Sequence, residues 1–324
     1  MGFSFPRLLA QWENSRRLHQ LYKGQITIGV ETWPGYMPFF VARDKGYFKE
    51  AGLDVSIKRY PGLGQLSKDY LAGKMQGRAN LTLDALNECL SGLDHKIVLA
   101  IDYSNGSDAI VATKEIKTVK DFKGKQVGYE PNTLEEFFVA WELNENEMSL
   151  LDVTSVFGSP EETAKLLKEG KIAVAVSHEP YLSRFVSSGE FHVVSSSAVA
   201  PGLITDVLTF RTDFIEAHPE TVQAIARVYF KALKFWKDHP EEADAILAKE
   251  FGDSPESIEN QMKGITMLDE RDNKTAFTFA VGLRSLYGNM RQIGEFVQNH
   301  QQIHLDRFNT DSLIERRFVV ALSE

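Results

Sequence analysis

The sequence contains a single cysteine, Cys89, in 324 residues. One cysteine cannot form a disulfide within the chain or a zinc site built from several cysteines. Ala85, Leu86 and Leu90 lie near it at helical spacing, so we expect Cys89 to pack as a small hydrophobic side chain rather than to act as a reactive thiol. A fold held together by disulfides is therefore excluded.

Long hydrophobic runs and blocks of basic residues are also missing. No run approaches the roughly 18 apolar residues that a membrane-spanning helix needs. Lysine and arginine number 36 against 45 aspartates and glutamates, which gives a formal net charge of −9. We expect no nucleic-acid partner, because phosphate backbones are bound by clustered positive charge.

The sequence motifs of hydrolytic, metal and phosphate chemistry are absent as well. There is no Gly-x-Ser-x-Gly nucleophile elbow and no His-Glu-x-x-His zinc motif. The pair Gly62 and Gly64 lacks the further glycine, lysine and serine of a phosphate-binding loop, and an ordinary turn explains it. We therefore expect no catalytic residues, no metal and no cofactor.

What the sequence does contain is an alternation of short apolar runs and amphipathic segments. Apolar runs at 97–101, 109–112, 126–129 and 172–176 are typical of buried strands, whereas 219–238 has the spacing of a helix. The alternation predicts an α/β fold whose sheets are largely parallel. The length of the chain suggests about two domains, although composition alone would also permit one large doubly wound domain.

Polar and aromatic residues follow several of the predicted strands where each strand ends. In open α/β sheets, ligands bind beyond the carboxyl ends of the strands, so these residues are the candidates for a binding site. The candidates are Trp33, Tyr36, Asp84, Asn105, Ser107, Asp108, Thr133, Glu135, Glu179 and Asp206.

The charge of these candidates indicates the kind of ligand. They include several carboxylates and no lysine or arginine. Unpaired carboxylates buried beside an anion would be strongly disfavoured. We therefore expect a neutral or cationic ligand that contains nitrogen, with Trp33 and Tyr36 able to stack on it. The alternative is that Asp84, Asp108 and Asp206 only cap helices or stabilise turns, which leaves the charge of the ligand open.

Several stretches resemble, in their order along the chain, one family of transport proteins. They are Trp33-Pro34-Gly35, ARDKGYFKEAGLDV at 42–55, DYSNGSDAIV at 102–111, KTVKDFKGKQV at 117–127, Glu179-Pro180 and PGLITDV at 201–207. Over about residues 25 to 320 the chain is similar to periplasmic solute-binding proteins of the nitrate, sulfonate, taurine and thiamine-pyrimidine ABC transporters.

The resemblance implies a type II periplasmic-binding fold, in which two lobes close about a hinge. Each lobe would be a mostly parallel sheet flanked by helices. The first lobe would comprise residues 25–108 and 203–324, and the second lobe residues 109–202. Residues 1–24 would be an additional N-terminal helical extension, with an amphipathic helix over 7–22.

The resemblance also implies a function. The expected protein is an extracytoplasmic, periplasmic and monomeric binding protein that closes on a small molecule and is recognised by a membrane permease or receptor. Pro6 and Arg7 interrupt the short apolar stretch near the start, so no secretory leader is recognisable.

Two alternatives remain open. One is a ligand-sensing module of a signalling protein, with the N-terminal helix transmitting the signal. The other is an enzyme on the same fold. The related thiamine-pyrimidine synthases carry a cysteine-rich motif and a lysine that holds pyridoxal phosphate, and the single cysteine here counts against that activity.

Overall fold

The computed structural model describes residues 20–60, 63–300 and 309–323. A helix is predicted over 7–22, and its part up to position 19 lies outside the described residues. Residues 20–24 are not helical, so the prediction of a helix through Tyr22 is wrong at this end. The backbone N–H of Tyr22 donates to Thr221 Oγ1 at 2.8 Å, and this hydrogen bond joins the segment to a neighbouring helix.

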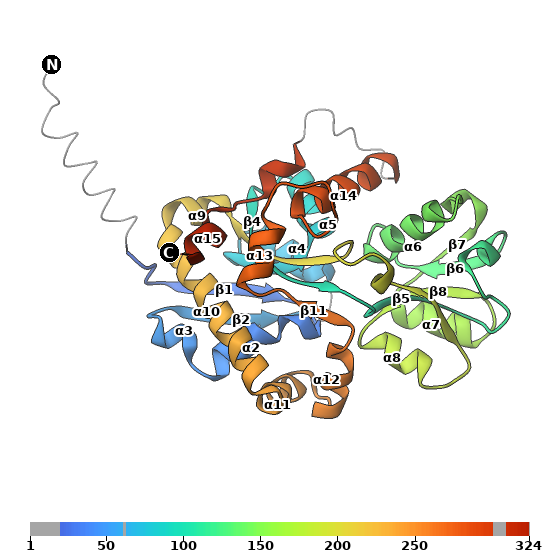
Figure 1. Ribbon diagram of the computed structural model, residues 1–324, viewed down its shortest axis with the longest axis horizontal. Helices are drawn as coiled ribbons and strands as arrows, with labels where there is room; N and C mark the ends of the chain where they lie inside the picture. The colour runs from blue at the N-terminus through green and yellow to red at the C-terminus, as the bar shows by residue number, and fades with distance from the viewer. Residues whose placement is uncertain (1–19, 61–62, 301–308, 324) are drawn as a thin grey trace, which may run out of the picture.

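The chain forms two β-sheets, which lie side by side in Figure 1. In the first sheet the strand order is β11-β4-β10-β3-β1-β2, and in the second it is β7-β6-β8-β5-β9. The strands of the first sheet are β1 (Gln25–Val30), β2 (Asp54–Arg59), β3 (Gly77–Leu81), β4 (His95–Ser104), β10 (Thr205–Arg211) and β11 (Ile265–Met267). Those of the second are β5 (Asp108–Ala112), β6 (Gln126–Tyr129), β7 (Thr154–Phe157), β8 (Val174–His178) and β9 (His192–Ser196).

Both sheets are mixed, with most strands running in one direction. In the first sheet β1 pairs in parallel with β2 and β3, while β10 is antiparallel to β3 and β4. In the second sheet β6 pairs in parallel with β7 and β8, while β5 is antiparallel to β8 and β9. The reversed strands are β5, β10 and the edge strand β11, which is antiparallel to β4. The chain enters its sheet directly from the other one at β5 and β10, without a crossover helix that would make these strands parallel.

Helices surround both sheets (Figure 1). Around the first sheet lie α2 (Met37–Asp44), α3 (Tyr47–Glu50), α4 (Leu63–Leu71), α5 (Thr82–Leu90), α9 (Thr212–Ala217), α10 (Pro219–Asp238), α11 (Pro240–Phe251), α12 (Pro255–Met262), α13 (Glu270–Ala276), α14 (Leu286–His300) and α15 (Arg317–Val320). Beside the second lie α6 (Leu134–Glu145), α7 (Pro160–Lys168) and α8 (Tyr181–Val186). The short 3-10 helices are η1 (Pro34–Tyr36), η2 (Val119–Phe122), η3 (Leu150–Asp152), η4 (Ser197–Val199), η5 (Thr310–Leu313) and η6 (Ala321–Ser323).

The two connections between the sheets lie next to each other. The first joins β4 to β5 through residues 105–107, and the second joins β9 to β10 through η4. The hydroxyl groups of Ser104 and Ser197 are hydrogen-bonded at 2.6 Å, and the N–H of Gly106 donates to Ser197 Oγ at 2.8 Å. Gly106 has φ 125°, a conformation that side chains rarely permit. These bonds tie the two connections into one junction between the lobes. The boundaries of the lobes at 108 and 202 stay a prediction.

The apolar core continues from one lobe into the other. Phe296 of α14 packs edge-on against Phe137 of α6, with ring centroids 5.0 Å apart. Cys89 lies half-buried beside this core, as expected for a small packed side chain. Within the described ranges, no helix is long and apolar enough to span a membrane.

Candidate ligand-binding site

A pocket lies between the two lobes and is lined by residues of both. It encloses about 550 Å³ of empty space, part of which is open to solvent. Its lining comprises Glu31, Thr32, Trp33, Tyr36, Leu81, Asp108, Glu130, Thr133, Leu134, Glu135, His178, Ile204 and Asp206.

The ends of strands from both sheets position this lining. Glu31 follows β1 directly, Glu130 follows β6, and His178 is the last residue of β8. The reversed strands contribute residues at their starts instead, Asp108 as the first residue of β5 and Asp206 as the second residue of β10. The pocket therefore lies where the carboxyl ends of most strands converge, as expected for a ligand site in an α/β sheet.

Most of the residues predicted from the sequence lie at this pocket. Those in its lining are Trp33, Tyr36, Asp108, Thr133, Glu135 and Asp206. Asp84 lines an outer chamber that shares Glu31, Glu130 and His178 with the pocket and extends it outwards.

Asn105, Ser107 and Glu179 line neither the pocket nor the outer chamber. Asn105 is exposed, and its amide donates to Thr266 Oγ1 at 3.3 Å. The backbone N–H of Asn105 donates to Gly264, because the connection packs on the segment before β11 rather than facing the cleft. Ser107 is buried in the same contact.

The carboxylate of Glu179 serves the start of α8 instead. It accepts hydrogen bonds from the hydroxyl group of Ser183 at 2.7 Å and from its backbone N–H at 3.3 Å. Its neighbour His178 faces the pocket, and adjacent residues at a strand end point to opposite sides. His178 thus belongs to the pocket lining, whereas Glu179 hydrogen-bonds to Ser183 of α8.

Several lining residues were absent from the sequence prediction. Glu31 and Glu130 directly follow strands, so the same reasoning about strand ends would have included them. Leu81, Leu134 and Ile204 carry no polar signal, and their position emerges only when the sheets are assembled.

Two neighbouring aspartates, Asp206 in the pocket lining and Asp102 outside it, accept hydrogen bonds from neutral donors. The hydroxyl group of Tyr36 donates to Asp206 Oδ1 at 2.5 Å. Behind the pocket, the indole N–H of Trp33 lies 3.3 Å from both carboxylate oxygens of Asp102. These hydrogen bonds hold the side chains of Trp33 and Tyr36 next to the two carboxylates.

The positive charge around Asp108 and Glu31 is too small to keep the pKa values of these carboxyl groups at their usual level. Asp108 is 4% exposed and its Oδ2 has no hydrogen-bond partner. Burial raises the pKa of Asp108 to about 6, and burial together with Asp84 raises the pKa of Glu31 to about 7. The pocket therefore disfavours the ionised forms of Asp108 and Glu31.

His178 supplies the one positive charge in the described lining. Its Nδ1 lies 3.5 Å from Glu135 Oε1, and Asp108 is its cross-strand neighbour. Burial lowers the pKa of His178, but the bond to Glu135 and the charges of Glu135, Asp108 and Glu31 outweigh this and raise it to about 9. His178 is thus protonated at neutral pH and offsets one of the surrounding carboxylates.

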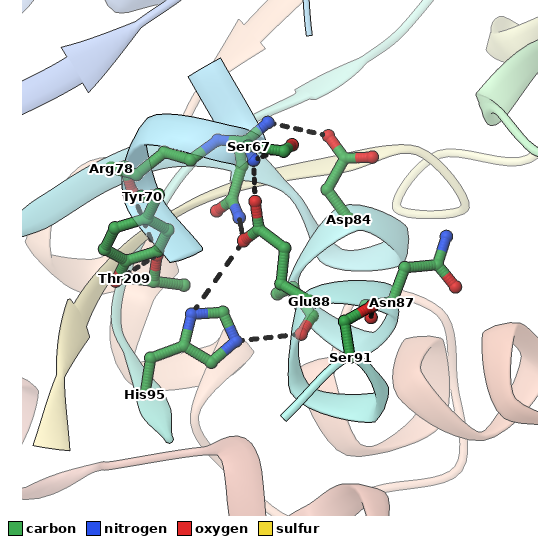
Figure 2. Close-up of polar contacts among 11 residues, drawn as sticks. Ser67, Tyr70, Arg78, Asp84, Asn87, Glu88, Ser91, His95 and Thr209 are labelled. Carbon is green, nitrogen blue, oxygen red and sulfur yellow. Dashed lines mark hydrogen bonds and ion pairs between the residues drawn. The ribbon is translucent and has the colours of Figure 1, made fainter. Parts of the chain in front are cut away.

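A second acidic group includes Asp84 and Glu88, which line the outer chamber. Its polar contacts are organised differently (Figure 2). Arg78 is fully buried and bonds to Glu88, to Asp84 at 3.3 Å and to Ser67 Oγ at 2.8 Å. Burial lowers the pKa of His95 to about 4, so Arg78 is the cation of this cluster. We call Arg78, Asp84, Glu88 and His95 the arginine cluster.

A metal is not indicated by the side chains present. In the described part of the chain, no group of three or more histidine, cysteine, aspartate or glutamate residues could hold a metal ion.

The two lobes, their paired connections and the pocket between them define the architecture of a periplasmic-binding fold. The chain belongs to the NMT1/THI5-like family, whose model matches residues 33–243. This membership confirms the resemblance seen in the sequence.

One curated relative is named as a binding protein, and solved structures share the fold. The chain is 26% identical over 264 residues to a putative aliphatic sulfonates-binding protein of Bacillus subtilis, covering 76% of this chain and 75% of the relative. Among solved structures it resembles the periplasmic aliphatic sulphonate-binding protein SsuA of Escherichia coli, with a TM-score of 0.71, 14% identity and coverage of 86% and 88%. It also resembles the desulfurization enzyme DSZB, with a TM-score of 0.64, 13% identity and coverage of 91% and 98%. The structural likenesses establish the shared fold.

Proposed function

We propose that this protein is the solute-binding component of an ABC importer and captures a small, nitrogen-containing cation between its lobes. A neutral nitrogen-containing molecule is the second choice for the same site. The observation that carries this proposal is the unpartnered, buried oxygen of Asp108 in a pocket whose described lining includes no lysine or arginine.

The charge of the pocket supports a cationic ligand. Five carboxylates line it, and only His178 opposes them. A ligand ammonium or amidinium group beside Asp108 and Asp206 would provide charge-assisted hydrogen bonds that the chain itself does not supply. An anion would instead meet buried carboxylates, which is costly unless each holds a proton.

The remaining lining supports a ligand with an apolar or flat part. Trp33 and Tyr36 present aromatic rings that are fixed by their hydrogen bonds to Asp102 and Asp206. Leu81, Leu134 and Ile204 add apolar surface. An aromatic or aliphatic amine, or an aminopyrimidine, combines these two requirements.

The names of the relatives favour a different ligand. The Bacillus subtilis relative and the Escherichia coli structure are named for aliphatic sulfonates. Sulfonate binding is therefore the competing hypothesis for this chain, and it requires that the pocket carboxylates be protonated or structural.

Binding without catalysis is the activity that the site supports. The desulfurization enzyme shares the fold, so the fold by itself does not distinguish binding from catalysis. Cys89 lies on α5 and does not line the pocket, so it is not placed to attack a bound molecule. We infer that the lobes close on the ligand in the periplasm and that a permease recognises the closed form.

A thermal-shift screen tests the proposal. The panel contains amines, pyrimidines, amides, sulfonates, nitrate and bicarbonate, each with wild-type protein and with Asp108→Asn. A ligand at about 100 times its Kd adds roughly 2.7 kcal/mol to the free energy of unfolding, a shift that is easily measured.

We expect stabilisation by amines or pyrimidines in the wild type and a smaller shift in Asp108→Asn. Stabilisation by sulfonates alone, unchanged in the variant, would refute the cationic ligand while leaving the solute-binding class intact.

A further inference from the structure

Asp102 and Asp206 are direct neighbours across two strands. In the antiparallel pairing of β4 and β10, Asp206 lies opposite Asp102. Side chains of such a pair project from the same face, with Cβ atoms about 4.5–5.5 Å apart. Both residues are buried, with 0% and 2% exposed. Two carboxyl groups therefore lie side by side out of contact with bulk water.

The surroundings of this pair do not supply a cation. Its hydrogen-bond donors are the neutral groups of Trp33 and Tyr36, both on the segment after β1. No ion pair joins either aspartate to lysine or arginine within the described ranges. A Cβ atom on Gly35 would lie 2.1 Å from Asp102 Oδ2, so the backbone closes tightly over this carboxylate.

Titratable groups from the other packed elements are acidic or neutral. Glu31 after β1 and Asp108 from β5 act on the pair with negative charge. Tyr229 from α10 remains neutral, because burial and the two aspartates raise its pKa well above the usual value. His178 from β8 acts on Glu31 and Asp108 and is itself held by Glu135 of α6.

Two ionised carboxylates this close in a buried, cation-free setting repel each other strongly. Such groups lose their protons in two separate steps that belong to the pair rather than to either residue. Burial, followed by the charge of Asp108, raises the pKa of Asp102 to about 8 despite the bond from Trp33. Burial, followed by the charge of Asp102, raises the pKa of Asp206 as well.

We propose that Asp102 and Asp206 share one proton at neutral pH, and that a bound cation takes the place of this proton. Asp102 lies outside the pocket lining and is thus a positioning residue that sets the charge of Asp206. The inference rests on the proposed function and names what the ligand displaces. The proton leaves to solvent as the cation enters, so the net charge of the site is unchanged.

The shared proton can be tested without any ligand. Carboxyl carbons of aspartate are labelled with carbon-13 in the full chain and followed by NMR from pH 4 to 10. We expect one carboxyl group of the pair to titrate above pH 7 in the wild type. In Asp102→Asn, whose amide oxygen still accepts from Trp33, we expect Asp206 to titrate below pH 7.

Complete ionisation of both aspartates below pH 6 in the wild type would overturn the proposal. If Asp102→Asn does not fold, Asp206→Asn gives the mirror measurement on Asp102. Asp244→Asn is the matched control, because Asp244 is also buried and accepts from an indole N–H, that of Trp236, at 3.3 Å but lies on α11 away from the pocket.

Calorimetry with benzylammonium tests the exchange. Heats measured at pH 7 in phosphate and in Tris report the protons released. We expect close to one proton per ligand in the wild type and in Asp244→Asn, with affinity rising about tenfold per pH unit below the upper titration. In Asp102→Asn we expect binding with little release.

The outcomes separate the two proposals. Binding of benzylammonium to the wild type without proton release would contradict the exchange and leave the cationic ligand standing. No binding by benzylammonium would count against both the cationic ligand and the exchange, while the NMR titration would still decide whether the pair shares a proton.

Discussion

Two acidic groups of the molecule differ in one respect. In the arginine cluster, Asp84 and Glu88 are paired with the buried guanidinium of Arg78 (Figure 2). At the pocket, Asp102 and Asp206 meet only neutral donors. We call Asp102, Asp206, Asp108 and Glu31 the pocket carboxylates.

The two acidic groups satisfy the same physical requirement in different ways. A buried carboxylate must be paired, hydrogen-bonded or protonated. The arginine cluster meets this requirement within the chain, because Arg78 pairs with both Asp84 and Glu88. At the pocket, Asp102 and Asp206 meet it in the free protein by the shared proton proposed above, and a cationic ligand offers an alternative. An acidic group with a structural role is thus paired with a cationic side chain of the protein, whereas an acidic group that binds a ligand lacks such a side chain.

Removal of the cation from the arginine cluster should have the largest effect. Arg78→Met leaves Glu88 buried without its partner, so we expect the free energy of unfolding to fall by about 3–5 kcal/mol. Urea denaturation measures the change. The double variant Arg78→Met, Glu88→Gln should recover much of this loss. A single variant within about 1 kcal/mol of the wild type would show that Arg78 does not compensate the cluster.

Removal of a pocket carboxylate should affect binding rather than stability. We expect Asp206→Asn to weaken binding of a cationic ligand by about 3 kcal/mol, roughly a hundredfold. Its free energy of unfolding should stay level or rise, because an amide is less costly to bury than a carboxylate. Calorimetric binding and urea denaturation measure the two effects. Lost stability with unchanged affinity would place Asp206 with the structural group.

The pH dependence of stability should follow the pocket carboxylates. Asp108 and Glu31 have pKa values of about 6 and 7 in the folded protein, above their usual values near 4. The folded state thus binds their protons more tightly than the unfolded state does. The stabilisation is present below pH 4 and is lost as the pH rises to about 7.

His178, with its pKa raised to about 9, acts in the same direction between about pH 6.5 and 9. We expect Tm, relative to Asp108→Asn, to fall as the pH rises from 4 to 7. If the Tm of the wild type instead rose relative to that of Asp108→Asn as the pH increased, the raised pKa of Asp108 would be contradicted.

The smallest effect is expected for Glu179→Gln. The carboxylate accepts from Ser183 at the start of α8, and the amide oxygen of glutamine can accept the same bond. We expect a change of no more than about 1 kcal/mol in stability and unchanged affinity for a cationic ligand. Thermal unfolding with and without ligand measures both. A marked loss of affinity would return Glu179 to the binding site.

The sequence predicted the alternation of strands and helices because each element has its own local pattern. Residues 219–238 are an example, since the spacing of their apolar side chains predicted a helix and α10 spans Pro219–Asp238. The reversal of β5 and β10 was not predicted, because strand direction depends on partners far away along the chain.

Part of the site was predictable for a similar reason. Trp33, Tyr36 and Asp206 lie near strand ends, a position that the sequence displays. Asn105 has the same signature but packs near Gly264, a contact that no local pattern reveals. Asp102 and Arg78 lie within strands, and their partners are set by cross-strand register and by helix packing. The charge balance of the pocket therefore required the three-dimensional structure.

The preference of the pocket for a cationic ligand is tested most directly by ligands of similar shape and different charge. Calorimetric titration at pH 7.5 with benzylammonium, benzyl alcohol and benzenesulfonate isolates the effect of charge. We predict that the cation binds most tightly, the alcohol more weakly and the sulfonate least of all. Tighter binding of benzenesulfonate than of benzylammonium would contradict the account and assign the pocket carboxylates a structural role.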